Sequence, residues 1–234
     1  MNKNIKNALL QMYANLDAAS KRQAERGVHD QGARSQVTSG KHLNPVAQTI
    51  RAELIDAGYH EHEVYYEGGC LRLPGWFRPS KDWDLLAFDD GDLLAVLELK
   101  SINSSFGNNA NNRTEESLGS AVDAAHAIKN SLIPFQSTPP VLGYVLVVRL
   151  CSESTKPGEV SLSTVYPVDE IYLHASYFKR LCVMCRRLLA ERIYQAVWIV
   201  GVNPETGEVS EPETDLTYEK FMAALKSQLF IHRS

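Results

Sequence analysis

The chain has 234 residues, 44% of them hydrophobic, and a formal net charge of −4 at pH 7. This length suffices for one large domain with a buried core, and no apolar run approaches the roughly 20 residues of a membrane span. We therefore expect a single domain over residues 1–234 of a soluble, cytoplasmic protein with no membrane partner. The four cysteines are too few for a disulfide scaffold, and core packing explains the Cys182–Cys185 spacing better than a metal site.

Charge is distributed unevenly along the chain. Residues 1–50 hold seven Lys and Arg against three acidic residues, a net charge of +4, whereas residues 201–234 carry −3. A basic segment on an acidic body allows nucleic acid to be held locally without indiscriminate affinity. Ordinary solvated helix charge explains the same pattern equally well.

The N-terminal part of the chain predicts two helices. Apolar residues at helical spacing indicate a helix over residues 3–26, and a long polar loop follows as far as Lys41. Asn44 is expected to cap a second helix that has Pro45 at its first position and Gly58 just past its end.

Strands and helices then alternate. Their order predicts an α/β fold, in which helices cover both faces of a mixed β-sheet. The expected strands cover residues 64–66, 71–73, 83–88, 93–100, 142–149 and 196–202; the expected helices cover 114–129, 176–194 and 216–230; and an Asn-rich loop is expected at 103–113.

Three charged residues lie at the ends of two neighbouring strands in the middle of the chain. Asp84 begins the first strand, and Glu98 and Lys100 end the second, which is otherwise apolar. Charges at the end of a buried strand are expensive to desolvate. A divalent metal and a phosphate substrate would give all three charges partners at once, which indicates a magnesium-dependent nuclease.

The loop between these strands decides whether the three side chains can act together. Because strand side chains alternate between faces, a plain two-residue loop at Asp90-Gly91 would put Asp84 and Glu98 on opposite faces. A three-residue loop, Asp89–Gly91, would oppose Asp84 to Val96 and bring all three charged side chains to one face. We therefore expect this longer loop or a β-bulge.

With that geometry, Asp84 and Glu98 could share one Mg²⁺ ion, which prefers oxygen ligands. Lys100 would position or activate a water molecule, or stabilise developing negative charge. A solvated pair of acids with Lys100 as a salt-bridge partner is an equally good reading of the spacing alone, because short motifs have high false-positive rates.

The stretch resembles the PD-(D/E)xK nuclease motif, with Trp83 in the place of the motif's proline. The wider chain is similar to the XhoI-type type II restriction endonucleases over most of residues 30–200. The similar segments are Gly32-Ala33-Arg34-Ser35, Phe77-Arg78-Pro79, Trp83-Asp84-Leu85-Leu86, Glu98-Leu99-Lys100-Ser101 and the most specific one, residues 105–116.

This resemblance implies a restriction-endonuclease-like core and Mg²⁺-dependent cleavage of both strands of a palindromic duplex. It further implies a CTCGAG-like target, 5′-phosphate ends and a cognate DNA methyltransferase encoded with the enzyme. One site per chain and two DNA strands predict a homodimer. Within the single nuclease domain, we expect an N-terminal helix and DNA-facing loop at 1–43, a catalytic core at 44–202 and a C-terminal helix at 203–234.

Other residues are weaker candidates. Glu53, on the second predicted helix, could join the metal site, although a surface acid is slightly favoured. Glu61, Glu63 and Glu67, flanked by His60 and His62, look like metal ligands, but a solvated loop or strand edge explains them better.

The Asn-rich loop directly follows the proposed metal strand, and amide and guanidinium groups can contact bases or phosphates. We expect DNA contact there, although Asn also suits an ordinary turn. The expected contacts are Asn108, Asn109, Asn111, Asn112 and Arg113, with Arg34, Ser35 and Lys41 as second choices.

Two alternatives remain open. A repair or recombination nuclease could share the same core, and a DNA-binding module could keep the fold without cleavage. The intact Asp84, Glu98 and Lys100 set argues against the second alternative.

Overall fold

A computed structural model describes residues 1–25, 41–158 and 165–234. Its centre is a six-stranded sheet in the order β1-β4-β5-β6-β7-β8, in which β5, β6 and β7 are parallel and the other pairs are antiparallel. The strands are β1 (Val64–Tyr65), β4 (Leu85–Asp89), β5 (Asp92–Ile102), β6 (Val141–Arg149), β7 (Ala196–Asn203) and β8 (Glu208–Ser210). A separate two-stranded ribbon pairs β2 (Arg72–Pro74) with β3 (Ser80–Asp82).

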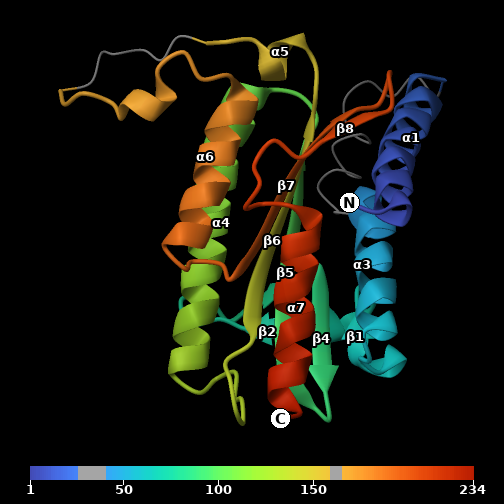
Figure 1. Ribbon diagram of the computed structural model, residues 1–234, viewed down its shortest axis with the longest axis vertical. Helices are drawn as coiled ribbons and strands as arrows, with labels where there is room; N and C mark the ends of the chain where they lie inside the picture. Colours follow the sequence, from blue (N-terminus) through green and yellow to red (C-terminus); the bar gives the residue numbers. More distant parts are fainter. Residues whose placement is uncertain (26–40, 159–164) are drawn as a thin grey trace.

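Helices cover both faces of this sheet, as the sequence predicted (Figure 1). One face packs against α1 (Lys3–Glu25), α3 (Asn44–Asp56) and α7 (Tyr218–His232), and the other against α4 (Phe106–Lys129) and α6 (Tyr177–Ala190). A short helix, α5 (Ser152–Thr155), follows β6. The eight residues of β6 before Arg149 are all buried, because a central parallel strand has helices on both sides.

Two local expectations were wrong. The second helix begins at Asn44 itself, and the Asn44 amide donates to Glu67 (2.6 Å) instead of capping the helix. The Asn-rich segment is a loop only as far as Ser105, because α4 begins at Phe106. Phe106 is buried between α4, α6 and the sheet, and this packing outweighs the weak helix propensity of Asn and Gly.

The β4–β5 hairpin combines a two-residue turn with a β-bulge. Asp89 pairs with Asp92, and the turn residues Asp90 and Gly91 have φ angles of 50° and 84°. The predicted three-residue loop is therefore wrong, but the register shifts by one at Phe88, so the bulge that we named as the alternative is present. The bulge leaves Leu94 as an extra, unpaired residue on β5. It returns Asp84 and Glu98 to the same face of the sheet, which the short turn alone would have prevented.

None of the helices in the described ranges combines the length and apolar character needed to cross a bilayer.

Close packing in the sheet centre gives a stability prediction. A Cβ added to Gly143 on β6 would lie 2.3 Å from Leu97 Cδ2 and 3.2 Å from Phe221 Cε2. We expect Gly143→Ala to lower the free energy of unfolding by about 1–3 kcal/mol, because overpacking strains a dense core. Urea denaturation would measure the change.

The control is Gly119→Ala on α4, where a Cβ meets nothing within 4 Å. This substitution should be neutral or stabilising by about 0.5–1 kcal/mol, because Ala favours helices. Equal destabilisation by both variants would contradict the packing explanation.

Candidate active site

A cleft of about 680 Å³ opens on the sheet face covered by α4 and α6. The end of β5, the start of β4, the ribbon strand β3 and the side of α4 form its walls. Its lining is dominated by charged residues. These are Arg78, Lys81, Asp82, Asp84, Glu98, Lys100, Arg113, Glu115 and Glu116.

The hairpin brings Asp84, Glu98 and Lys100 into this cleft together. The last regular pair is Leu85 with Leu97, so one further step in that register would place Asp84 across from Glu98. We had expected Asp84 to lie across from Val96. At this point Asp84 leaves the ladder, and its carboxylate accepts a hydrogen bond from the Leu99 amide (2.7 Å). That bond fixes the Asp84 carboxylate beside the end of β5.

Glu98 is 3% exposed and lies between two lysines. Lys81 Nζ is 2.6 Å from its Oε2, and Lys100 forms an ion pair with its Oε1. Burial raises the pKa of Glu98, but the two ammonium groups outweigh this effect and hold the pKa below its ordinary value. Glu98 is therefore a carboxylate at neutral pH.

The pKa of Asp84 shifts in the opposite direction from that of Glu98. Burial, followed by repulsion from Glu98, raises its pKa, although Lys100 lies 4.0 Å from Oδ2 and opposes the shift. The pKa of Lys100 is also raised, because attraction to Glu98 and Asp84 outweighs burial. A cation placed beside Asp84 would relieve the repulsion between the two carboxylates.

This donor set fits a divalent cation. Two carboxylates of neighbouring strand ends face one cleft, and oxygen ligands of this kind suit Mg²⁺. Lys81 and Lys100 supply the positive charge that the buried Glu98 needs when no metal is bound.

The structure does not bring Glu53, the weaker metal-ligand candidate, to this site. Glu53 lies on α3, on the opposite face of the sheet. Its carboxylate accepts hydrogen bonds from Asn2 (2.6 Å) and Tyr218 (2.9 Å) and pairs with Lys226.

The expected DNA contacts are dispersed. Arg113 lines the cleft, with its guanidinium 2.7 Å from Glu116, whereas Asn108 and Asn111 line a separate hollow between α4 and α6. Asn109 donates to the Ser104 carbonyl (2.7 Å), and Asn112 is exposed. Lys41 is exposed and lines a third hollow, next to Asp84; Arg34 and Ser35 lie outside the described residues.

The structure adds three residues that sequence reasoning did not assign to the site. Lys81 reaches Glu98, Arg78 lines the cleft, and His42 bonds Ser101 at the end of β5 (2.7 Å). Lys81 and Arg78 belong to the β2–β3 ribbon, whose fold over the sheet has no periodic signal. His42 follows a polar stretch of sequence, and nothing near it in the sequence indicates a contact 59 residues away.

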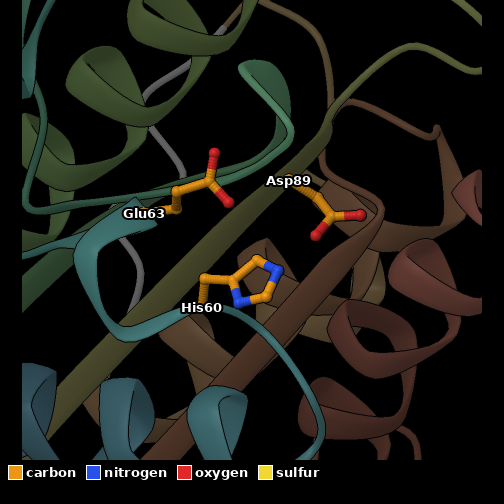
Figure 2. Close-up of side chains that lie close together, drawn as sticks. All are labelled: His60, Glu63 and Asp89. Atoms are coloured by element: carbon orange, nitrogen blue, oxygen red, sulfur yellow. The ribbon is translucent and has the colours of Figure 1, made fainter.

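A second polar cluster lies away from this cleft. His60, Glu63 and the buried Asp89 converge near the β4–β5 turn, as Figure 2 shows. Arg233 donates to both oxygens of Asp89, and Glu63 accepts from the amides of Asp90 and Gly91. These hydrogen bonds join the β4–β5 hairpin to the residue that follows α7.

The Asp89–Arg233 pair predicts a pH-dependent contribution to stability. The bonds from Arg233 lower the pKa of Asp89, so the pair stabilises the fold above the ordinary carboxyl pKa of about 4 and loses this effect as pH falls through the lowered value. We expect Arg233→Ala to cost about 1–3 kcal/mol at pH 7 and progressively less as the pH falls below the ordinary carboxyl pKa.

Urea denaturation across this pH range would measure the difference. Arg72→Ala is the matched control, because its Asp82 partner is exposed and such a pair contributes little. A loss of stability in Arg233→Ala that does not change with pH would contradict the ion-pair explanation.

Comparison with known proteins identifies the family of this chain. The profile of the family described as "Restriction endonuclease XhoI" matches residues 22–211. The type II restriction enzyme BstVI of Geobacillus stearothermophilus is 37% identical over 84% of this chain and 90% of its own length. Type II restriction enzyme XhoI of Xanthomonas vasicola is 39% identical over 68% of this chain and 64% of its own length, and no solved structure matches. The chain therefore belongs to the XhoI family of type II restriction endonucleases.

Proposed function

We propose that this protein is a Mg²⁺-dependent type II restriction endonuclease that cuts both strands of duplex DNA at a short palindrome. The observation that carries the proposal is the convergence of Asp84, Glu98 and Lys100 in one charged cleft. Membership of the XhoI family supports site-specific DNA cleavage as the reaction class.

Asp84 and Glu98 would hold the metal between the two strand ends. Mg²⁺ bound there would offset the charge of the scissile phosphate and lower the pKa of a bound water. Lys100, whose ammonium lies between both carboxylates, would orient that water or stabilise the negative charge that develops on the phosphate. Lys81 would keep Glu98 in its charged form.

Arg113 is proposed as a phosphate contact. Its Nε atom is buried and has no hydrogen-bond partner among residues 1–25, 41–158 and 165–234. A buried guanidinium N–H without a partner is costly, and a phosphate oxygen entering the cleft would satisfy it. Asn108, Asn109, Asn111, Asn112, Lys41, Arg34 and Ser35 remain proposed contacts with the flanking DNA.

Resemblance to the same family supports further proposals about the reaction. We propose a CTCGAG-like target, 5′-phosphate and 3′-hydroxyl products, and action in the cytoplasm as a single nuclease domain. A cognate methyltransferase would protect the host's own copies of the target, acting on DNA and not as a stable partner.

Incubation with plasmid DNA and Mg²⁺ tests the proposal. Discrete fragments with one common end sequence support a restriction enzyme, and sequencing those ends identifies the target. Structure-dependent nicking would favour the repair nuclease instead, and a mobility shift without cleavage would favour a binding module.

The proposed roles predict the effect of two substitutions. Glu98→Gln and Lys100→Ala should each lower the rate of plasmid cleavage by about 10³-fold or more, because a metal site supplies several kcal/mol of transition-state stabilisation. Cleavage assays at equal enzyme and Mg²⁺ concentrations would measure the loss, with circular dichroism to check the fold.

Glu53→Gln is the matched control, since Glu53 lies on the opposite face of the sheet. It should cleave at the wild-type rate. Wild-type cleavage by Glu98→Gln or Lys100→Ala would remove that residue from the mechanism.

Symmetry predicts that the active species is a homodimer. One chain carries one Asp84–Glu98–Lys100 site, and two chains related by a two-fold axis match the symmetry of a palindrome. Analytical ultracentrifugation with a cognate duplex should detect two chains per duplex. A complex of one chain that still breaks both strands in a single event would refute the dimer.

A further inference from the structure

The loop that joins β2 to β3 presents two exposed aromatic side chains. Trp76 is 46% exposed and Phe77 is 68% exposed. Arg78, the next residue, lines the cleft that holds Asp84 and Glu98. Neighbouring exposed apolar side chains that form a patch rimmed by polar residues can mark an interaction site, whereas single exposed ones do not.

A buried carboxylate holds this loop in place. Asp123 of α4 is 3% exposed, and its Oδ1 atom accepts hydrogen bonds from the amides of Trp76 (2.8 Å) and Phe77 (2.7 Å). Its Oδ2 atom pairs with Arg78 Nε at 2.8 Å. One carboxylate therefore fixes three successive residues of the loop.

Two further contacts leave the loop little freedom. A Cβ on Gly75 would lie 2.6 Å from Asp123 Oδ2 and 2.7 Å from the Arg78 carbonyl, so this position has room only for glycine. The Phe77 ring also packs against His126 of α4, with ring centroids 5.2 Å apart. The aromatic side chains are thus exposed on a rigid support, which lowers the entropy cost of binding a partner.

The loop lies at the rim of the cleft. A volume of about 680 Å³ is that of a pocket for a small ligand, so it can admit the reacting phosphodiester but not a whole duplex. The rest of the DNA must lie on the rim, to which Arg78 belongs.

We infer that the loop of residues 75–78, held by Asp123, is a DNA-contact element of this enzyme. Trp76 and Phe77 pack against bases or sugars beside the scissile phosphate, and Arg78 contacts the backbone. This inference rests on the proposed function and extends it to residues outside the metal site.

The chemistry of the loop suits nucleic acid. Aromatic rings stack on bases regardless of their sequence, and a neighbouring guanidinium supplies charge for the phosphates. Apolar side chains can also wedge between base steps. A protein partner would explain the exposed rings of Trp76 and Phe77 but not the position of Arg78 in the lining of the charged cleft. Duplex DNA explains both.

Tryptophan fluorescence gives a direct test. The chain has three tryptophans, and Trp83 and Trp198 are buried, whereas Trp76 is exposed. In Ca²⁺ without Mg²⁺, addition of a duplex that contains the enzyme's cleavage sequence should change the emission of the wild type. Trp76→Phe should lose most of this change.

Affinity provides a second test. By fluorescence anisotropy with the same duplex, Phe77→Ala should bind roughly 5- to 100-fold more weakly, as expected for the loss of a stacked ring. Phe230→Ala is the matched control, because Phe230 is 77% exposed on α7, on the other face of the sheet. It should bind like the wild type.

Asp123 serves as a positioning residue, and two variants separate its contacts. Asp123→Asn keeps a carbonyl oxygen for the two amides and should retain the Trp76 signal while losing the Arg78 pair. Asp123→Ala removes both contacts, so the amides of Trp76 and Phe77 should exchange hydrogen faster and affinity should fall at least as far as in Phe77→Ala.

The outcomes distinguish this inference from the proposed function. If the wild type cleaves plasmid DNA but Trp76→Phe keeps the full emission change and Phe77→Ala binds normally, the inference fails and the function stands. If the wild type neither cleaves nor binds any DNA, both fail. If Phe77→Ala alters the oligomeric state in sedimentation without weakening DNA binding, the loop is a protein contact and the inference is overturned.

Discussion

The buried negative charge of Glu98 is the constraint on which the cleft depends. A carboxylate at 3% exposure, next to the apolar core, persists only with cationic partners. Lys100 comes from the same strand, but Lys81 comes from the β2–β3 ribbon, so that ribbon must fold over the sheet end. The same ribbon carries Arg78 and the aromatic loop to the rim. The need to pair Glu98 with Lys81 therefore also positions Arg78 and the aromatic loop at the rim of the cleft.

The two faces of the sheet differ in the role of their polar residues. On one side, α1, α3 and α7 form an apolar layer, and polar groups such as Glu53 and Asp89 serve to join elements. On the other side, α4 contributes a wall of the cleft through Arg113 and the anchor of the aromatic loop through Asp123. One long helix thus links the charged cleft to the surface beside it.

Sequence reasoning found the parts of the fold that periodicity encodes. The long helices, the buried strands β6 and β7 and the convergence of Asp84, Glu98 and Lys100 all follow from apolar patterns and side-chain parity. It failed where tertiary packing decides, because Phe106 draws Asn-rich sequence into α4. It also left open whether Glu53 reaches the site, which depends on the side of the sheet on which α3 lies. Lys81 was missed because its approach to Glu98 depends on the ribbon, which has no pattern of its own.

The bulge in the β4–β5 hairpin has a consequence for how this family can vary. Loss of the one extra residue, Leu94, would leave the turn and the helices in place but invert which side Glu98 faces relative to Asp84. Insertions and deletions between Asp84 and Glu98 should therefore survive in active relatives only in even numbers, or with a compensating change of turn. An odd gap at this hairpin without such a change of turn would mark a relative that has kept the fold and lost the alignment of the two carboxylates.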